Sequence, residues 1–427
     1  MIEQVNERVE LAKSAFLKTM KLPLERRNAM LECFAELVEE QSDFLLTANA
    51  KDLEEQEGKI SPQLYQRLKL SSEKIETLVS GIRSLAKMPD PIGQKKLKRQ
   101  LSDGLVLEQK TVPLGVLAII FESRPDVIPQ ILSLVLKSGN VALLKGGKEA
   151  LHSNRAFIEL AFMMTNEFDD LPKGWAQLLE SRQDVADLLN QHGNIDLIIP
   201  RGGNQLVQYV MNNTKIPVLG HADGICHAYV SESAVVEKAL PLIHDSKAQY
   251  PSACNALETL LIHKSKAKSL LAAMKDAPKF KKFQYFGDVA AMAGLGFEVK
   301  PVDSWSVEYG DLSMSIKVVD HLHQAIDHIN TYGSHHTDAI ITEDKSEAEE
   351  FLASIDSASV FVNASTRFAD GFRYGKGAEV GISTSKIHAR GPVGMEGLTT
   401  TTYHLRGAGH TVQDFSDGKR QYQFKDL

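Results

Sequence analysis

Apolar side chains follow two different periods along the chain. In residues 2–90 they recur with helical spacing, as at Val5 and Val9, and this spacing predicts a helical segment. From Pro113 onward, short continuous apolar runs such as Gly115–Phe121 alternate with amphipathic stretches. Continuous runs are typical of strands buried on both faces of a parallel sheet, so the repeated strand–helix units predict a doubly wound α/β fold.

Two series of such units follow one another. The first is predicted to contain strands at Gly115–Phe121, Val141–Leu144, Ala176–Leu179, Ile195–Ile199 and Ile216–Leu219. The second begins after residue 254, with strands expected at Thr259–His263, Phe297–Val302, Ser315–Val319, Ala339–Thr342 and Val360–Asn363. Ahead of the first series, Asp103–Gly104 between two alternating runs predicts a β-hairpin, whose edge could pair with another subunit.

Composition and charge narrow the class of protein. The chain has 427 residues, enough for two or three domains, and 48 basic against 55 acidic residues give a net charge of −7. A mildly acidic chain argues against a nucleic-acid-binding surface. Three cysteines imply no disulfide framework, the first residues show no apolar signal region, and no apolar run reaches about eighteen residues. We therefore expect a cytoplasmic protein without a membrane span.

Three loops that follow predicted strands of the first series combine a cation with glycine or proline. They are ESRPD (Glu122–Asp126), LKGGKE (Leu144–Glu149) and PRGGN (Pro200–Asn204). In a doubly wound sheet, ligands bind beyond the carboxyl ends of the strands, where helix N-termini with bare N–H groups attract anions. The loops predict a site for a phosphate-bearing ligand such as a nucleotide, although turn formation alone would also explain any one of them. No GxGxxG fingerprint occurs.

One cysteine, Cys254, lies in the turn-rich stretch QYPSACNALE (Gln249–Glu258), just before an apolar run. Free cysteines are most often buried and behave as small hydrophobes, but the polar and proline-containing surroundings disfavour an apolar pocket here. A helix N-terminus or a set of backbone N–H groups beside the thiol would favour the nucleophilic thiolate. Cys254 is therefore a candidate nucleophile, whereas Cys33 falls on the apolar stripe of a helix and is expected in the core.

Histidines gather at His321, His323 and His328, and again at His335–His336. A zinc site would need further ligands at suitable spacing, and no cysteine or carboxylate stands nearby at such a spacing. The histidine positions also fall on what the pattern predicts to be a polar helix face. We therefore predict no metal site.

Several segments of the chain resemble a known family. QYPSACNALETLLIH is similar to the active-site segment of the gamma-glutamyl phosphate reductases, a branch of the aldehyde dehydrogenase superfamily. The blocks VPLGVLAIIFESRPDV, LKSGNVALLKGGKEA, IDLIIPRGG, VFVNASTRFADG and HARGPVGMEGLTT also resemble that family, in its order, up to about residue 400. The resemblance implies an aldehyde dehydrogenase-like α/β fold, with two Rossmann-like parallel-sheet domains and a small β-hairpin oligomerisation element.

The resemblance also implies a division into domains, and it implies partners. Residues 1–94 and 112–232 would form the NADP-binding domain, residues 233–395 the catalytic domain carrying Cys254, and residues 95–111 and 396–427 the oligomerisation strands and tail. A homodimer or homotetramer is expected. Because nothing in the chain resembles an amino-acid kinase, a separate glutamate 5-kinase that makes the acyl phosphate is implied as a transient partner.

The implied reaction is the NADPH-dependent reduction of L-glutamyl 5-phosphate to L-glutamate 5-semialdehyde with release of phosphate, the second step of proline synthesis. Cys254 would attack the acyl phosphate and form a thioester. The Cys254 N–H would contribute to the oxyanion hole, a residue within Glu122–Arg124 would complete it, and Asn255 would shape the turn. Hydrolytic relatives carry a glutamate that activates water, and the matching stretch PVLGHADG (Pro217–Gly224) lacks one, which fits a reductase.

The same resemblance implies the cofactor and its contacts. NAD-preferring relatives place a glutamate three residues after the strand-end lysine, where this chain has Lys148 after Lys145. A lysine there would pair with a 2′-phosphate, so NADP(H) is predicted, with the neighbouring Glu149 as an open question. The predicted cofactor-binding residues are Lys145, Gly146, Gly147, Lys148, Arg201, Gly202 and Gly203.

The substrate's α-carboxylate requires a cation, and Arg367 in the segment NASTRF is the first candidate, with a plain surface role as its alternative. Ser123 and Arg124 are further substrate-binding candidates, and Arg124 and Arg201 could instead hold a phosphate. Two other functions stay open: another acylating or hydrolytic aldehyde dehydrogenase of a small substrate, and an inactive α/β scaffold that serves interactions.

Overall fold

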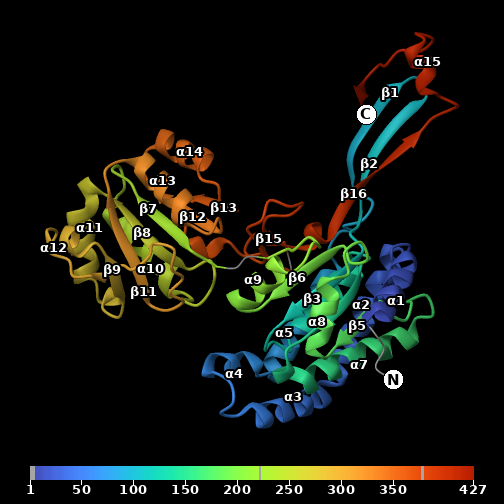
Figure 1. Cartoon of the computed structure of the whole chain (residues 1–427), viewed down its shortest axis with the longest axis horizontal. Coiled ribbons are helices and arrows are strands. Elements are labelled where there is room, and N and C mark those ends of the chain that lie inside the picture. The colour runs from blue at the N-terminus through green and yellow to red at the C-terminus, as the bar shows by residue number, and fades with distance from the viewer. Residues whose placement is uncertain (1–4, 221–222, 377–378) are drawn as a thin grey trace. The chain divides into compact units, whose positions relative to one another are not determined.

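The computed structural model describes residues 5–220, 223–376 and 379–427, and the chain forms two compact units (Figure 1). Unit 1 comprises Met1–Leu219, Lys376–Gly381 and Val393–Leu427, and unit 2 comprises Gly220–Gly375 and Ile382–Pro392. The structure thus places the first boundary at residue 219, ahead of the expected residue 232. The reason is that strand β7 (Cys226–Val230) pairs with strands of the second sheet.

Unit 1 begins with helices, as the spacing of its apolar residues predicted. Among the described residues these are α1 (Val5–Thr19), α2 (Leu24–Glu40), α3 (Ser42–Gln56), α4 (Pro62–Leu68) and α5 (Ser72–Ala86). Apolar side chains such as Met30 and Phe34 of α2 are buried. Cys33 lies at the margin of that stripe and is only half-buried, so its placement in the core was wrong.

The sheet of unit 1 is parallel, with the order β5–β4–β3–β6. Its elements in chain order are β3 (Val116–Phe121), α6 (Val127–Lys137), β4 (Val141–Lys145), the short helix η1 (Lys148–Ala150), α7 (Leu151–Glu167), β5 (Ala176–Leu179), α8 (Arg182–Leu189), β6 (Leu197–Arg201) and α9 (Asn204–Asn212). β3 is buried along its whole length, as its apolar run predicted. The strand predicted at Ile216–Leu219 is reduced to one bridge between Ile198 and Val218. All four strands end at one edge of the sheet.

Unit 1 also carries a four-stranded antiparallel sheet, which we call the arm (Figure 1). Its strands are β1 (Lys95–Ser102), β2 (Leu105–Pro113), β16 (Thr399–Arg406) and β17 (Lys425–Asp426), with helix α15 (Val412–Ser416) between the last two. The predicted hairpin is confirmed, because β1 and β2 pair across a turn in which Gly104 has a φ of 68°. β17 covers the outer edge of β1, which the sequence did not indicate.

Unit 2 contains a seven-stranded parallel sheet with the order β10–β9–β11–β8–β7–β12–β13. Besides β7, its elements are α10 (Val236–Ala248), β8 (Leu257–His263), α11 (Lys264–Asp276), η2 (Pro278–Phe280), β9 (Gln284–Gly287), α12 (Val289–Ala293), β10 (Lys300–Pro301), β11 (Ser313–Val319), α13 (Leu322–Tyr332), β12 (Thr337–Ile341), α14 (Lys345–Ser354), β13 (Ser359–Val362) and η3 (Thr366–Phe368). The last elements along the chain before β16 are β14 (Gly381–Ser383), β15 (Gly391–Val393) and η4 (Met395–Leu398). The strand predicted at Phe297–Val302 shrinks to β10, and β9 takes its place beside β11.

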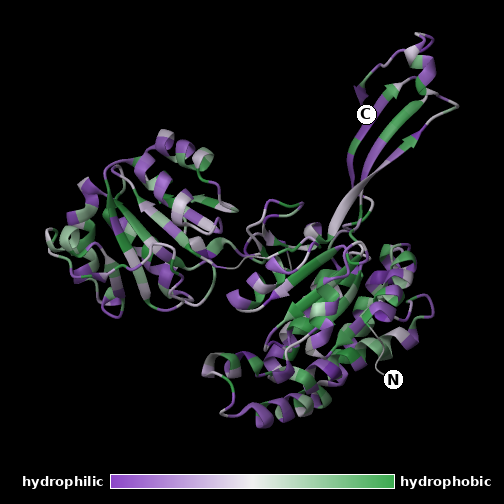
Figure 2. Cartoon of the chain, viewed as in Figure 1, coloured by the Kyte–Doolittle hydropathy of each residue, from purple (hydrophilic) through white to green (hydrophobic). Residues whose placement is uncertain are grey.

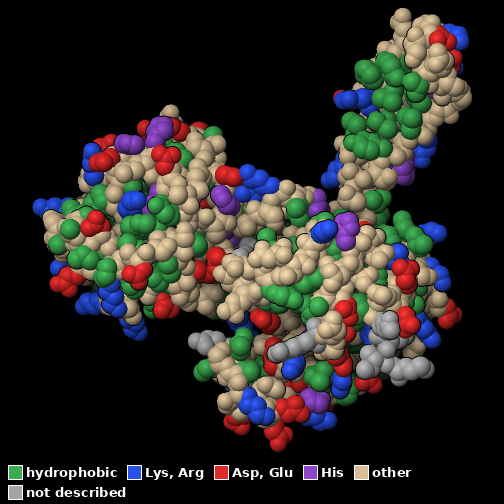
Figure 3. Space-filling view, viewed as in Figure 1, with side chains coloured by type: hydrophobic (Ala, Val, Ile, Leu, Met, Phe, Trp, Pro, Cys, Tyr) green, Lys and Arg blue, Asp and Glu red, His purple; other side chains and the backbone are tan. Residues whose placement is uncertain are grey.

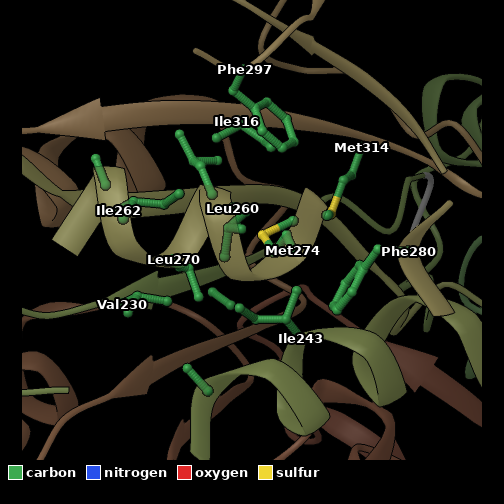
Figure 4. Packing of buried hydrophobic residues seen from close by; sticks show 14 of the residues in the cluster. Val230, Ile243, Leu260, Ile262, Leu270, Met274, Phe280, Phe297, Met314 and Ile316 are labelled. Carbon is green, nitrogen blue, oxygen red and sulfur yellow. The ribbon is translucent and has the colours of Figure 1, made fainter. Parts of the chain in front are cut away.

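Apolar side chains cover both faces of the unit 2 sheet, because successive residues of a strand point to opposite sides. On one face, Leu260 belongs to the same cluster as Met274 of α11 (Figure 4). On the other face, Leu261 packs with Ile329 of α13 and Phe351 of α14. Figure 2 shows the result, with hydrophobic strands inside and mixed helices outside. A sheet buried on both faces leaves its edges as the places where chemistry can be exposed.

The prediction that the histidines share a polar helix face is wrong at most positions. Only His323 and His328 lie within α13, His321 caps its N-terminus, and His335–His336 lie between α13 and β12. His328 is buried within α13, and its ring lies edge-on to Trp305, so it does not lie on a polar face. Burial, His227 and Lys317 lower the pKa of His328 to about 3, which keeps the ring neutral. Within the described residues, no group of three or more metal-ligating side chains is placed to hold a metal ion. No helix in the same part of the chain is long and apolar enough to cross a membrane.

Candidate active site

Cys254 lies in a tight turn between the end of α10 and the start of β8. The Ala256 N–H donates to the Ala253 carbonyl at 2.8 Å, and the Ala253 N–H donates to the Tyr250 carbonyl at 3.1 Å. The thiol is half-buried and free. No helix begins at this turn in the described chain, so of the two expected activating features only backbone N–H groups are present. Among the described residues, the Cys254 N–H has no hydrogen-bond acceptor.

The start of β7 packs directly beneath this turn. The Cys226 thiol donates to the Cys254 carbonyl, with sulfur and oxygen 3.3 Å apart, and burial raises the pKa of Cys226 well above its ordinary value. A Cβ added at Gly224 would lie 2.0 Å from that same carbonyl oxygen. The Gly224 N–H donates to Glu308 at 3.1 Å. Gly224 is therefore required because the Cys254 backbone occupies the space of a side chain.

Asn255 is buried beside the cysteine. Its Nδ2 donates to the Ala369 carbonyl at 2.8 Å, which ties the turn to the segment after η3. Its Oδ1 is buried and has no hydrogen-bond partner among the described residues. These contacts agree with the expected role of shaping the turn, and that role stays a prediction.

Arg367 lies in η3 and is only 8% exposed, so a plain surface role is wrong. Its Nε donates to Gln249 Oε1 at 2.9 Å, and its guanidinium lies 5.8 Å from the centre of the Tyr250 ring. Burial is the main cause that lowers the pKa of Arg367, and the nearby Arg373 adds to it, whereas Cys254 acts in the opposite direction. Because Asn255 is hydrogen-bonded to the Ala369 carbonyl, two residues after Arg367, the turn of Cys254 and η3 adjoin each other within unit 2.

A buried ion pair that the sequence did not reveal supports the same turn. Lys247 Nζ lies 2.7 Å from Glu258 Oε2, and both side chains are fully buried. The Glu258 carboxylate also accepts from the Tyr309 N–H at 3.2 Å. Burial raises the pKa of Glu258 to about 7, and Lys247 opposes that rise. The sequence does show Lys247 and Glu258 on either side of Cys254. Because charged residues are rarely fully buried, their presence did not predict a buried ion pair.

In unit 1, the loops after β3, β4 and β6 meet at the carboxyl edge, as the sequence predicted. Glu122 Oε2 accepts from the Gly203 N–H at 2.8 Å, and a Cβ added at Gly202 would lie 2.5 Å from that oxygen. Glu149 Oε1 accepts from both the N–H and the hydroxyl of Ser123 at 2.7 Å each. Ser123 has a φ of 37°, an unusual conformation that these two bonds stabilise. The Glu149 carboxylate is thus engaged within the protein.

A cavity of about 310 Å³ lies where the β4 and β5 strands end, and Gly146, Gly147 and Lys148 line it. A Cβ added at Gly147 would lie 2.0 Å from Glu149 Oε1, so the backbone itself forms the wall. Lys145 is buried, and its Nζ donates to the Gly146 carbonyl at 2.6 Å. Burial lowers the pKa of Lys145. A glycine-walled cavity with one lysine, Lys148, at the carboxyl edge of a parallel sheet fits the adenosine part of a dinucleotide.

The two remaining arginine candidates differ in their contacts. Arg124 Nη2 lies 3.1 Å from Asp126, and its side chain is 42% exposed. Arg201 Nη1 donates to the Val380 carbonyl, so part of this guanidinium is engaged within unit 1. Arg124 therefore remains available to a ligand at the carboxyl edge, whereas Arg201 also has a structural role.

Comparisons with known proteins agree with this description. A model of the aldehyde dehydrogenase family matches residues 2–288. A gamma-glutamyl phosphate reductase of Synechococcus sp. strain JA-3-3Ab is 49% identical over 98% of this chain and 93% of its own length. That of Brachyspira hyodysenteriae is 47% identical over 99% of this chain and 100% of its own length. The crystal structure of the Thermotoga maritima gamma-glutamyl phosphate reductase has a TM-score of 0.93 at 35% identity, over 96% of this chain and 100% of that one.

The chain belongs to the aldehyde dehydrogenase family and, within it, to the gamma-glutamyl phosphate reductases. The predicted family and fold are confirmed. An acetylating aldehyde dehydrogenase of Geobacillus thermoglucosidasius shares the fold alone, with a TM-score of 0.64 at 17% identity over 95% of this chain and 97% of that one. Membership of this family implies a nicotinamide cofactor.

Proposed function

We propose that the chain reduces L-glutamyl 5-phosphate to L-glutamate 5-semialdehyde, with release of phosphate, using NADPH as the reductant and Cys254 as the nucleophile. It is then an oxidoreductase of proline biosynthesis. The observation that carries the proposal is the half-exposed Cys254, with its open N–H and the buried Arg367 beside it, in a chain nearly half identical to gamma-glutamyl phosphate reductases over its length.

The chain's own residues supply most of the chemistry. The Cys254 thiolate attacks the acyl carbon, the bond from that carbon to the phosphate oxygen breaks, and phosphate leaves with the electron pair. When bound, NADPH supplies the hydride that reduces the resulting thioester. Collapse of the thiohemiacetal then returns the thiolate and releases the aldehyde. In hydrolytic relatives a glutamate activates the water that hydrolyses the thioester. The sequence of Pro217–Gly224 contains no glutamate. Residues 221 and 222 of this stretch lie outside the described residues.

Each tetrahedral intermediate needs donors for its oxyanion. The Cys254 N–H is available within unit 2. In the loop after β3, the Glu122 N–H donates to the Arg201 carbonyl at 3.1 Å, and both donors of Ser123 are engaged by Glu149. Of the three expected candidates in that loop, we therefore favour Arg124 as the donor to a substrate oxygen.

The preference for NADPH rests on Lys148. This residue lines the cavity at the carboxyl edge, and a lysine can pair with a 2′-phosphate. The open question about Glu149 becomes less serious, because two hydrogen bonds hold its carboxylate at Ser123. Lys145 and the glycines of the same loop would contact the rest of the dinucleotide.

We also propose that the chain forms a homodimer or homotetramer through the arm. Apolar side chains of the arm are exposed, among them Tyr403 at 61% and Leu405 at 57%, and Figure 3 shows an apolar patch on its surface. Sedimentation of wild type and of Leu405→Asp would test this, because the charged variant should dissociate. A cytoplasmic location and transient contact with a glutamate 5-kinase stay predictions.

One coupled assay tests the proposed function. Glutamate semialdehyde, phosphate and NADP⁺ should together yield NADPH, and omitting phosphate should abolish the signal. Cys254→Ala should lower kcat by about 10⁴-fold or more while leaving NADP⁺ binding intact. Equal rates with and without phosphate would instead favour a hydrolytic dehydrogenase. An inactive scaffold would be favoured by two results together. No NADPH would form under any condition, and neither NADPH nor substrate would slow the alkylation of Cys254.

A further inference from the structure

We propose that the buried ion pair of Lys247 and Glu258 positions Cys254 for its attack on the substrate. Lys247 lies in the last turn of α10 and Glu258 lies in β8, so Cys254 stands between them along the chain. Both are positioning residues, because they act through the backbone that carries the thiol. The inference rests on the proposed function, since it takes Cys254 as the nucleophile.

The pair closes the base of the loop that carries the nucleophile. Residues 249–256 connect the end of α10 with the start of β8. Lys247 Nζ and Glu258 Oε2, at the two ends of this loop, lie 2.7 Å apart. A reacting group is held in place when its supporting residues are themselves fixed by packing and hydrogen bonds. The ion pair is such a support, because it fixes the distance between the ends of a short loop.

Stability alone does not explain a charged pair at this place. β8 is buried along its whole length, and Glu258 is its one carboxylate. Moving two charges out of water costs free energy, so exchanging a buried ion pair for apolar residues of similar volume is often neutral or stabilising. An apolar pair could therefore hold α10 against β8 equally well. What the ion pair adds is a directed contact with one defined geometry.

Glu258 also fixes the loop that precedes β11. Its Oε2 accepts from the Tyr309 N–H at 3.2 Å, and its Oε1 accepts from the Gly310 N–H at 3.4 Å. Tyr309 is anchored in turn, because its hydroxyl lies 2.8 Å from Ser315 Oγ in β11. Its ring stacks on Phe286 of β9, with the ring centres 4.9 Å apart. Both carboxylate oxygens of Glu258 are thus tied to a loop that the sheet holds.

The same loop leads back to Cys254 through a second route. Glu308 Oε2 accepts from the Gly224 N–H at 3.1 Å. Gly224 in turn lies so close to the Cys254 carbonyl that an added Cβ would be 2.0 Å from its oxygen. These contacts form a closed circuit, from the Cys254 turn through Glu258, residues 308–310 and Gly224 back to the Cys254 carbonyl. Loss of Glu258 opens this circuit, and we expect the thiol to shift.

The contacts of the candidate substrate cation follow another path. The Thr366 N–H of η3 donates to Ser246 Oγ of α10 at 3.2 Å, and Arg367 Nε donates to Gln249. Neither contact involves Glu258. A change at Glu258 should therefore slow the chemical step while leaving the binding of glutamate semialdehyde as it is.

A double replacement separates positioning from stability. In Lys247→Met/Glu258→Leu an apolar pair takes the place of the charges, so resistance to urea denaturation should equal or exceed that of wild type. The kcat of the phosphate-dependent assay should still fall by about 10- to 100-fold, because catalysis is sensitive to shifts of about 1 Å, with KM for the semialdehyde unchanged. Glu258→Gln keeps an acceptor for the Tyr309 N–H, so it should retain more kcat than Glu258→Leu. Leu270→Ala, in the apolar cluster of α11, is the control that should lose stability but keep kcat.

Each other outcome has a distinct meaning. A stable double variant with the kcat of wild type would overturn the positioning role and leave the proposed function standing. A double variant that does not fold would show that the pair serves stability, and a raised KM with normal kcat would assign it to substrate binding, so either result overturns the inference. A wild type that forms no NADPH in the presence of phosphate would overturn the proposed function itself.

Discussion

The two parallel sheets of this chain place their candidate functional residues at opposite edges. In unit 1 the glycine and lysine loops follow the strands, so they lie at the carboxyl edge. In unit 2 Cys254 precedes β8, and Cys226, which packs beneath its turn, begins β7, so both residues lie at the amino edge. The same architecture is therefore used in two ways.

The difference follows from helix polarity. At a carboxyl edge, helices start next to the loops, and their N-terminal N–H groups attract phosphate without further help. At an amino edge, helices end next to the loops, as α10 ends before Cys254. The C-terminus of a helix carries a partial negative charge, which does not favour a thiolate. We therefore expect the amino edge to position the thiol by close backbone packing, as at Gly224, and to stabilise the thiolate with the nearby cation Arg367.

The largest effect on catalysis is expected from a change at the amino edge of the unit 2 sheet alone. Gly224→Ala should push the Cys254 carbonyl away, because the new Cβ would lie 2.0 Å from that oxygen. We expect kcat to fall by about 10²-fold or more, since catalysis is sensitive to displacements of about 1 Å, with unchanged affinity for NADP⁺. Gly294→Ala is the matched control in unit 2, because the nearest atom to its Cβ is 3.6 Å away. Loss of NADP⁺ binding in Gly224→Ala would contradict the separation of roles.

The reciprocal change disturbs the carboxyl edge. Lys148→Glu should lower the preference for NADP(H) over NAD(H) by about 10²-fold, because a carboxylate repels the 2′-phosphate that the lysine would pair with. The measurement is kcat/KM for both cofactors in the semialdehyde direction. The rate of Cys254 alkylation should stay the same, and Lys51→Glu, an exposed lysine on α3, serves as the charge control. An unchanged cofactor preference would remove Lys148 from the site.

A third change separates substrate binding from the chemistry at the amino edge. Arg367→Ala should raise KM for glutamate semialdehyde by about 50-fold, because one charge-assisted contact to the α-carboxylate is lost. Arg367→Lys should recover part of the affinity and show that charge matters, since the Gln249 contact belongs to the guanidinium. A normal KM in the folded alanine variant would exclude Arg367 as the carboxylate-binding residue.

The smallest expected effect concerns the buried pair under the turn. Burial raises the pKa of Glu258 to about 7 from an ordinary 4.5, so the folded state holds this proton more tightly than the unfolded state does. Its contribution to stability is fully present below pH 4.5 and is lost as the pH rises to about 7. Relative to Glu258→Gln, wild type should lose about 2–3 kcal/mol of unfolding free energy over that range, as measured by urea denaturation. Parallel pH profiles of the two proteins would contradict the raised pKa.

The sequence was sufficient where one residue pattern has one structural meaning. The continuous apolar run at Gly115–Phe121 could hardly form anything but a buried strand, and Asp103–Gly104 gave the hairpin. β7 was missed because the segment Cys226–Val230 is short, and its pairing partners in β8 and β12 lie far along the chain. Pro217 lacks an N–H, which limits the segment predicted as a strand at Ile216–Leu219 to one bridge.

The candidate active site could also be predicted from the sequence only in part. Cys254 and the glycine loops could be recognised because reactive thiols and phosphate-binding turns need particular residues in short stretches. The buried pair of Lys247 and Glu258 could not, because its importance comes from burial and from neighbours distant in sequence such as Tyr309. The structure was therefore needed to identify the residues that support the site through packing.

The arm also carries a consequence for the making of the protein. β2 is synthesised long before β16, its pairing partner, because the whole of unit 2 lies between them along the chain. On the ribosome, β2 must therefore present an unpaired edge during most of translation, and such edges promote aggregation. A nascent chain that stops before Thr399 would keep that edge exposed. Release of a full-length chain is thus the event that protects the arm, and stalled synthesis should produce the form most dependent on chaperones.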